Sequence, residues 1–388
     1  MVSIGAVLLG NDFQALGVVR SLVEHNIPMV LIKFEPGICR YSRYVKRRIV
    51  DKSLLNDAVF ADRLIHFAKK EKLKGWVLYP NNDEIVKLLS LNRKKLQGWY
   101  LNPVLGWEVT EKYYYKNKTY DIAESISIPI PKRYKGNAIH DYMKQNMRFP
   151  IVLKPTYKEK YYSITRRKAL KVDNLFEFEK EYNEMSNIID HSEIVVQEYV
   201  EGGTKNLYSY ACFFDGKDIV SGMAARRLRQ HPMDFGHATT YAVPVNVPEL
   251  KKLAARILKE IGFYGIAEVE FMWDERDQVF KFIEINGRVW GWHTLARATG
   301  VNTPYIQFQH ITGIDVQVQK PDLNVKWVRI LTDIPTVIKE LLGRRMTVKT
   351  YIQSLHGKKE FAVLSLRDPL PFLIELLLMP YLWWKRGF

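Results

Sequence analysis

Acidic and amide side chains recur at alternate positions in two neighbouring segments: Glu268 and Glu270 in the first, Glu284 and Asn286 in the second. Both segments are rich in strand-forming residues, and the polar stretch 274–277 between them predicts a hairpin turn. Because alternate residues of a strand share a face, we expect Glu270 to lie opposite Glu284, so that two carboxylates and an amide oxygen converge.

Like charges that oppose each other across a sheet destabilise it unless a positive charge lies between them. Carboxylate and amide oxygens are the hard ligands that Mg²⁺ uses together with substrate phosphates. The sequence therefore predicts a metal site formed by Glu270, Glu284 and Asn286. The alternative interpretations are a solvated hairpin edge and simple turn formation at Asn286 and Gly287.

Cationic residues stand where they could bind anions beside such a site. Arg288 follows Asn286 by two residues, and its guanidinium could stabilise charge that develops during phosphoryl or acyl transfer. Lys154 ends the apolar strand 149–154, where a buried ammonium is unfavourable unless it meets an anion, and Lys118 opens a helix. Both lysines suit nucleotide phosphates. A surface arginine, and a lysine whose ammonium reaches solvent, are the alternatives.

A further strand, 195–200, breaks into the glycine pair at 202–203. Such a break leaves backbone N–H and C=O groups free, which is the pattern that an adenine edge can use. An adenine site and a strand that merely ends in a loop are equally open interpretations of this segment; the resemblance stated below is what assigns Gln197, Glu198, Tyr199 and Val200 to adenine.

The elements that must position these residues fall into two regions. Residues 1–108 alternate strands and helices, which predicts a parallel sheet of the Rossmann-like α/β class. The expected strands are 4–9, 28–32 and 75–79, and the expected helices are 13–25, 58–70 and 83–91. The turn at 10–12 lies at the carboxyl end of a strand, where such sheets bind ligands. Nucleotide binding, acceptor binding and a purely structural turn all remain open there.

A second region of mixed strands and helices begins near residue 109; the resemblance stated below implies that it is a domain of two α+β subdomains over residues 109–315, followed by a C-terminal extension over 316–388. Beyond the strands already named, two hairpins are expected, 207–214 with 218–223 and 267–273 with 278–286. Helices are expected at 120–125, 175–185 and 250–261.

Composition limits the function classes. The chain has 388 residues, 47% hydrophobic and 26% charged, which excludes a largely disordered chain and a disulfide scaffold. Its two cysteines disfavour a cysteine-based zinc site and fit a reducing cytoplasm. The net charge of +16 favours polyphosphates, nucleic acid or an anionic membrane as neighbours. No nucleic-acid-binding motif appears, so we expect no nucleic-acid partner. The N-terminus lacks the basic start of an export signal.

Taken in order, these features resemble the ATP-grasp superfamily. The resemblance covers residues 1–315 and is carried by Lys118 and by four segments. These segments are 149–155, 197–200, 268–271 and 284–288. Within that superfamily, the pattern of motifs resembles the carboxylate–amine ligases, which include D-aspartate ligase-like proteins and relatives of the carbamoyl-phosphate synthetase large chains.

The resemblance implies an N-terminal α/β domain and an ATP-grasp domain that form a cleft. It implies that Lys118 and Lys154 contact ATP phosphates, that residues 197–200 line adenine, and that Arg288 stabilises the acyl-phosphate and tetrahedral states. Glu270, Glu284 and Asn286 would then hold Mg²⁺, with Mn²⁺ as the alternative. The implied reaction consumes ATP, forms ADP and an acyl phosphate, and joins a small-molecule carboxylate to an amine, or less readily to a thiol.

Two segments depart from the family pattern. The phosphate lid of the family is rich in glycine, whereas the segment 157–167 has no glycine; its basic residues could replace backbone amides with charge. These are Lys158, Lys160, Arg166 and Arg167. An acidic ribose ligand is expected after the glycine turn, but residues 204–206 are Thr-Lys-Asn, and Glu201 is the substitute that the sequence offers.

The segment 226–239 joins basic residues to a Pro/Gly loop and is predicted to bind the acid substrate. Arg226, Arg227 and Arg229 are the candidate substrate-binding residues. At least one of the three should reach a phosphate or carboxylate. Trp290 and Trp292 would wall the acceptor pocket or, alternatively, pack in the core.

The segment 369–386 combines apolar bulk, aromatic residues and terminal cations, and is interrupted by Glu375 and Pro380. It is too short to span a bilayer, so it predicts peripheral attachment to an anionic membrane surface on the cytoplasmic side. A helix docked on the protein's own core or on a second subunit of a homodimer is the alternative. A catalytically silent nucleotide-binding or regulatory protein is the alternative to an enzyme.

Overall fold

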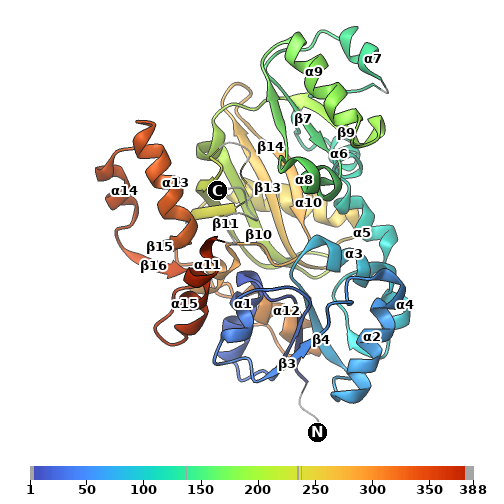
Figure 1. The fold of residues 1–388 in the computed structure, drawn as a ribbon, viewed down its shortest axis with the longest axis vertical. Helices are drawn as coiled ribbons and strands as arrows, with labels where there is room; N and C mark the ends of the chain where they lie inside the picture. Colours follow the sequence, from blue (N-terminus) through green and yellow to red (C-terminus); the bar gives the residue numbers. More distant parts are fainter. Residues whose placement is uncertain (1–3, 137, 234–235, 237, 381–388) are drawn as a thin grey trace.

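The N-terminal region forms a five-stranded parallel sheet at the bottom of the molecule (Figure 1). The computed structural model describes residues 4–136, 138–233, 236 and 238–380. The sheet order is β3-β2-β1-β4-β5. Its strands are β1 (Ala6–Leu9), β2 (Met29–Lys33), β3 (Arg47–Val50), β4 (Trp76–Pro80) and β5 (Tyr100–Leu101). Its helices are α1 (Phe13–Val23), α2 (Asp57–Lys70), α3 (Asp83–Leu91) and α4 (Arg93–Leu96).

The predicted parallel α/β class is confirmed, because β1, β2 and β4 are buried apolar strands with helices between them. The strand β3 was not predicted because its side chains are mostly exposed and two of them are arginines, so it lacks an apolar pattern. The side chain of Asp12 accepts a hydrogen bond from the Ala15 amide (2.9 Å) and caps α1, which gives the turn at 10–12 a structural role.

A four-stranded antiparallel sheet with the order β6-β9-β7-β8 forms the upper lobe in Figure 1. Its strands are β6 (Arg133–Tyr134), β7 (Ile151–Pro155), β8 (Leu170–Val172) and β9 (Ile194–Glu198). Two helices, α5 (Trp107–Tyr114) and α6 (Lys116–Ser125), lead into this lobe, and three more belong to it. These are α7 (Ile139–Met143), α8 (Lys158–Thr165) and α9 (Leu175–Ser186).

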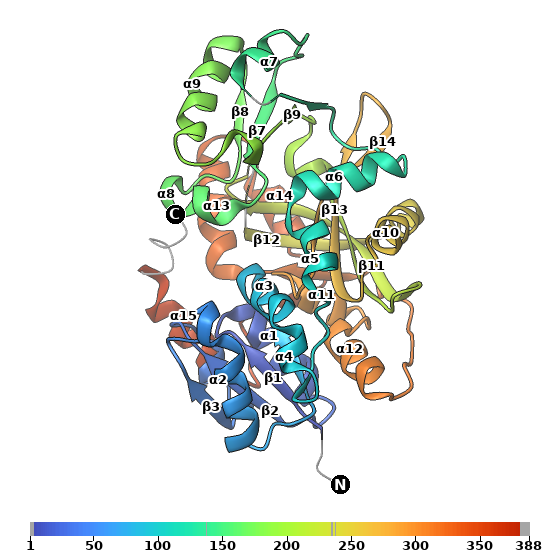
Figure 2. The same ribbon diagram turned by 90° about the vertical axis from the view of Figure 1, so that its right-hand side faces the viewer.

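A seven-stranded sheet with the order β14-β13-β10-β11-β12-β15-β16 forms the middle of the molecule. Its strands are β10 (Leu207–Phe214), β11 (Ile219–His231), β12 (Ala238–Val245), β13 (Gly265–Asp274), β14 (Val279–Asn286), β15 (Val325–Val328) and β16 (Lys358–Phe361). The helix α10 (Pro248–Ile261) packs against β10 and β11 (Figure 2). Two further helices, α11 (His293–Ala298) and α12 (Thr303–Thr312), follow the β13–β14 hairpin. The predicted fold class, with two α+β subdomains after the α/β domain, is confirmed.

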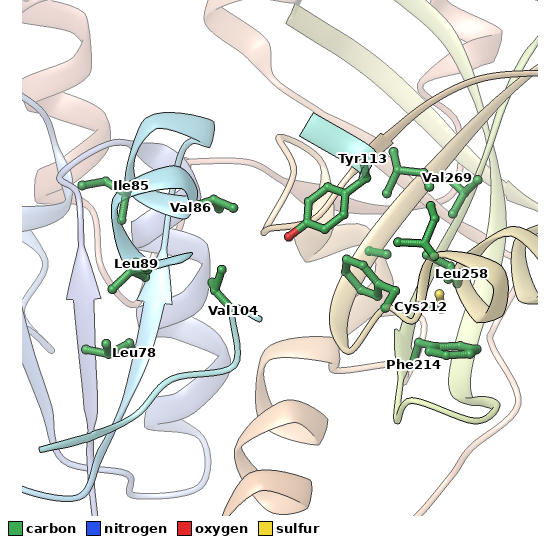
Figure 3. Close-up of a cluster of buried hydrophobic side chains, with 14 of the residues drawn as sticks. Leu78, Ile85, Val86, Leu89, Val104, Tyr113, Cys212, Phe214, Leu258 and Val269 are labelled. Carbon is green, nitrogen blue, oxygen red and sulfur yellow. The ribbon is translucent and has the colours of Figure 1, made fainter. Parts of the chain in front are cut away.

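One apolar core is continuous between the N-terminal sheet and the central sheet (Figure 3). On one side lie Leu78 and residues of α3, and on the other lie Leu258 and Val269, with Val104 and Tyr113 between them. The N-terminal region is therefore held against the central sheet by packing, which fixes the position of α3 relative to β14.

Residues beyond 315 contribute to the central sheet. β15 pairs antiparallel with β12, and β16 pairs parallel with β15. The helices of this part are α13 (Ile330–Leu342), α14 (Val348–Ser354) and α15 (Leu370–Leu377). Asp368, just before α15, accepts hydrogen bonds from Ser42 Oγ (2.8 Å) and from the guanidinium of Arg20 on α1, so the chain returns to the N-terminal region. Among the described residues, no helix is both long and apolar enough to cross a bilayer.

Candidate active site

A cavity of about 470 Å³ lies where the small sheet, the central sheet and the start of α1 meet. Many of the residues predicted from the sequence line it, although they come from separate strands. These are Lys154, Gln197, Glu198, Tyr199, Val200, Arg227, Glu270, Glu284, Asn286 and Arg288. The fold therefore brings most of the predicted site to one place.

The β13–β14 hairpin supplies the acidic wall of the cavity. Its register places Glu268 opposite Asn286 and Glu270 opposite Glu284, as the spacing predicts. The intervening residues Val269 and Ile285 point to the other face and are buried in the apolar core. The alternation of apolar and acidic residues thus fixes which face of the hairpin meets the cavity.

Protein cations and amides already compensate these carboxylates. Arg227 on β11 pairs with Glu270 Oε2, and Lys116 pairs with Glu284 Oε2. The Asn286 amide donates to Glu268 Oε2 (3.1 Å) and to Glu270 Oε1 (3.0 Å). The expectation that positive charge must lie between the opposed carboxylates is met here in part by an arginine and a lysine.

Burial and neighbouring charges shift the pKa values of Glu268 and Arg227. Glu268 also accepts from Ser209 Oγ (3.0 Å) and from the Trp292 indole (2.9 Å), and it is 2% exposed. Burial, followed by repulsion from Glu270, raises the pKa of Glu268 to about 7. Burial acts to lower the pKa of Arg227, but the nearby carboxylates of Glu270 and Glu268 outweigh it and raise that pKa.

The donor set fits a hard divalent cation. Glu270, Glu284 and the Asn286 side-chain oxygen border the same cavity, and oxygens are the ligands that Mg²⁺ takes. The Asn286 amide turns its nitrogen toward the carboxylates and its Oδ1 toward Arg288 (3.3 Å). Coordination by that oxygen requires the amide to flip, an exchange of two nearly isosteric groups. The acidic trio Glu198, Asp274 and Asp277 is different, because the Lys281 ammonium pairs with all three.

The lysines divide between the cavity and its surroundings. Lys154 is 7% exposed, and its ammonium donates to the Tyr120 hydroxyl (2.6 Å). Burial, with repulsion from Lys116 next, lowers the pKa of Lys154 to about 7. Lys118 is not among the described residues that line the cavity; its ammonium pairs with Glu111 (2.8 Å). Lys116, two residues earlier on α6, borders the cavity instead.

Arg288 is held by the N-terminal region. Its Nε and one terminal nitrogen donate to the two oxygens of Asp83, at 2.7 and 3.0 Å. Asp83 is the first residue of α3, so a bidentate pair connects the parallel sheet to the end of β14. Sequence reasoning missed Asp83 because 205 residues separate it from its partner.

The predicted adenine segment lies at the end of β9. The Tyr199 amide donates to Pro150 O (3.2 Å), and Glu198 accepts from the Lys281 ammonium (2.5 Å). The side-chain oxygen of Gln197 is buried in the cavity wall without a hydrogen-bond partner among the described residues. Glu201, the predicted ribose ligand, is exposed and is not among the described lining residues.

The glycine-free segment 157–167 contains the helix α8, which contributes Tyr162 to the cavity wall. The side chain of Lys158 lies outside the described residues, and neither Lys160, Arg166 nor Arg167 lines the cavity. The lid role of this segment stays a prediction.

The three predicted substrate arginines lie on one long strand, β11, which continues to His231 where the sequence suggested a loop. Only Arg227 of these three lines the cavity. Arg226 donates to Lys205 O (2.6 Å), and Arg229 is buried against Asp333 (2.8 Å). Of the loop that follows, Asp234, Phe235 and His237 lie outside the described residues. Trp290 and Trp292 are each 1% exposed, yet both border the cavity. Both tryptophans therefore pack in the core and also form part of the cavity wall.

A protein-family model described as "Carbamoyl-phosphate synthase L chain, ATP binding domain" matches residues 244–318, which include the β13–β14 hairpin. The D-aspartate ligase of Enterococcus faecium (strain Aus0004) is 24% identical over 301 residues, 73% of this chain and 70% of the relative. The chain is thus similar to proteins of the ATP-grasp superfamily. The predicted resemblance is thereby confirmed, and so is the prediction of an ATP-grasp enzyme.

Two solved structures show how the ATP-grasp fold is shared. The biotin carboxylase domain of Hydrogenobacter thermophilus 2-oxoglutarate carboxylase, in complex with MgADP and bicarbonate, has a TM-score of 0.65 at 18% identity. That match covers 84% of this chain and 74% of the other. The L-amino acid ligase of Bacillus licheniformis has a TM-score of 0.60 at 14% identity, covering 79% and 74%.

Proposed function

We propose that this ATP-grasp protein is an ADP-forming ligase that uses ATP and Mg²⁺ to join a small-molecule carboxylate to an amine. The observation that carries the proposal is the pairing of Glu270 with Glu284 on the cavity face, beside Asn286. Lys154 and Arg288 border the same cavity, so anion-binding groups stand next to hard oxygen donors.

In this proposal Glu270, Glu284 and Asn286 hold Mg²⁺, which supplies charge neutralisation at the transferring phosphoryl group. Lys154 and Lys116 bind ATP phosphates as point charges, and Gln197 to Val200 face the adenine. Lys118, held by Glu111 outside the cavity, would have to leave that pair to serve as the predicted phosphate ligand. Arg288, oriented by Asp83, faces the acyl phosphate.

The chemistry has two steps. A substrate carboxylate oxygen attacks the γ-phosphorus of ATP, the bond to the β,γ-bridging oxygen breaks, and ADP leaves. An amine then attacks the acyl carbon, inorganic phosphate leaves with the bonding electrons, and the amine releases a proton. Positioning and electrostatic stabilisation can supply most of the catalysis in such a sequence.

The test is ADP release by the purified chain with MgATP, screened against D- and L-amino acids, hydroxy acids and bicarbonate, each with amine or thiol acceptors. We expect one acid–amine pair to stimulate ADP release, and Glu284→Gln to abolish this while ATP still binds weakly. Stimulation by a thiol alone would favour a carboxylate–thiol ligase. ATP binding without turnover across the whole screen would favour the catalytically silent alternative.

We also propose that the C-terminal segment attaches peripherally to an anionic membrane surface on the cytoplasmic side. Leu370, Leu373 and Leu377 on α15 are exposed at helical spacing, which supports the proposal, while Trp383 to Arg386 lie outside the described residues. Co-sedimentation with phosphatidylglycerol vesicles, compared for the full chain and a chain ending at Arg367, tests it. A homodimer stays a prediction that sedimentation velocity would test.

A further inference from the structure

Among its described residues, the region beyond residue 315 contributes Arg329 to the active-site cavity. Arg329 lies between β15 and α13, and its backbone amide donates to Thr240 O (2.9 Å). The side chain is 3% exposed and borders the cavity beside Phe13 and Gly291. A residue from outside the predicted 109–315 domain is therefore part of the cavity wall.

The guanidinium of Arg329 has fewer partners than its burial requires. Among the described residues its one hydrogen bond goes to Glu375 Oε1 (2.6 Å) on α15, and its Nε has no partner. An arginine has five N–H groups, and buried polar groups are normally satisfied. Arg229, the comparable buried arginine of the same sheet, uses all three nitrogens, two on Asp333 and one on Ser354.

The position of Arg329 relative to the reacting groups follows from two contacts. Its guanidinium carbon lies 3.8 Å from the centre of the Phe13 ring. The same ring approaches Gly291, where a Cβ would lie 3.5 Å from it. Phe13 is the first residue of α1, and Gly291 follows Arg288 by three residues, so Arg329 stands at the start of α1 beside the segment that follows β14. Lys154 on β7, Lys116 on α6 and Arg329 between β15 and α13 thus reach the cavity from different elements.

The surroundings of Arg329 suit a short organic acid. Phe13 stacks on the Arg329 guanidinium, and elsewhere the cavity is lined by the apolar Trp290 and Met233 and by the amides Gln14 and Gln230. A planar guanidinium with unused N–H groups binds a carboxylate through two parallel hydrogen bonds. Glu375, buried at 3% exposure of its side chain, holds the guanidinium on one side and leaves the rest for a ligand.

We propose that Arg329 is the substrate-binding residue for a carboxylate other than the reacting group, so that the enzyme selects a dicarboxylate or acidic amino acid. This inference rests on the proposed function, since it names the substrate class of the same cavity. Glu375 acts as a positioning residue that orients the Arg329 guanidinium from α15.

The test compares acids with their amide counterparts, aspartate with asparagine and succinate with succinamate, by ADP release and by calorimetric binding to the full chain. We expect the wild type to prefer the dicarboxylates, and R329Q to raise their KM or Kd about 10- to 100-fold while the KM for ATP changes less than two-fold. R329K should restore part of the loss, and E375Q should weaken the same acids. R345Q, at an exposed arginine paired with Glu340, is the control.

An unchanged preference in R329Q, with ATP binding intact, would overturn the assignment. A stronger response to phosphomonoesters than to dicarboxylates would overturn the carboxylate class. Dicarboxylate binding to the wild type and not to R329Q, without ADP release, would support the Arg329 site while refuting the ligase proposal, so the two failures are distinguishable.

Discussion

Lys154→Met should make the protein without ATP more stable. The Lys154 ammonium is buried, lies near the Lys116 ammonium, and has the Tyr120 hydroxyl as its hydrogen-bond partner. Methionine keeps an unbranched apolar side chain in the same space and removes the charge. Tyr120 still donates to Ile283 O (2.8 Å), so the substitution leaves that hydroxyl with a partner.

The magnitude follows from the pKa of Lys154, which burial lowers from 10.5 to about 7. Each pKa unit corresponds to about 1.4 kcal/mol, so the shift destabilises the folded state by roughly 5 kcal/mol when Lys154 is fully charged and by roughly 4 kcal/mol at pH 7. The lost hydrogen bond to Tyr120 offsets about 1 kcal/mol. We therefore expect Lys154→Met to raise the free energy of unfolding by about 2–4 kcal/mol at pH 7.

The pH dependence has a definite sign. Between pH 7 and 10.5 the unfolded chain holds a proton that the folded Lys154 lacks, so wild-type stability rises with pH across this window. The advantage of Lys154→Met is therefore largest at and below pH 7 and shrinks toward pH 10.5. Urea denaturation of both proteins at pH 7, 8 and 9 measures the difference.

ATP should reverse the order of stability, because bound phosphate favours the charged lysine. We expect saturating MgATP to stabilise the wild type and to have little effect on Lys154→Met. A stability difference that does not change with pH, or a variant less stable than the wild type at pH 7, would refute this reasoning.

Three further substitutions test other contacts of the fold. Asp83→Asn removes half of the bidentate pair with Arg288. We therefore expect kcat for ADP release to fall about 10- to 100-fold, with the KM for ATP changed less than two-fold. A change confined to the KM for ATP would contradict the positioning role of Asp83. Lys281→Met leaves Glu198 and Asp274 without the Lys281 ammonium. We expect the free energy of unfolding, measured in urea, to fall by about 3 kcal/mol, and the KM for ATP to rise. Unchanged ATP binding would show that this ion-pair network does not support the adenine site. Burial lowers the pKa of His293 to about 4, so we expect the free energy of unfolding to fall by about 3 kcal/mol as the pH drops from 6.5 to 4. His293→Gln should flatten that decline when urea denaturation is measured across this pH range. Equal slopes in both proteins would show that other groups control acid stability.

The acidic hairpin shows how far a strand pattern reaches. Alternation alone predicts the register of Glu270 with Glu284, because a slip of one residue would bury the carboxylates and expose Val269. The same pattern could not supply the compensating charges. Arg227 comes from a strand that is not adjacent to β14 in the sheet, and Lys116 comes from the start of α6, so only the folded chain brings them to the carboxylates.

The lysines and arginines show the limit of residue type as a guide. Lys116 and Lys118 are chemically identical and two residues apart on one helix, yet only Lys116 borders the cavity. Their separation of about 200° around the helix, from 3.6 residues per turn, turns them to different sides. Arg226, Arg227 and Arg229 divide in the same way along β11, since the direction of each side chain depends on the pleat and on a bulge near Arg229.

The sequence by itself determined the alternating α/β pattern of the first region and the hairpin whose polar face carries Glu270, Glu284 and Asn286. These are local properties, because hydrophobic periodicity selects each element and the face that it buries. Only the tertiary structure decided that Asp83 holds Arg288 and that Arg329 borders the cavity. Such contacts join residues far apart in the chain, and their geometry depends on how whole sheets pack rather than on any local pattern.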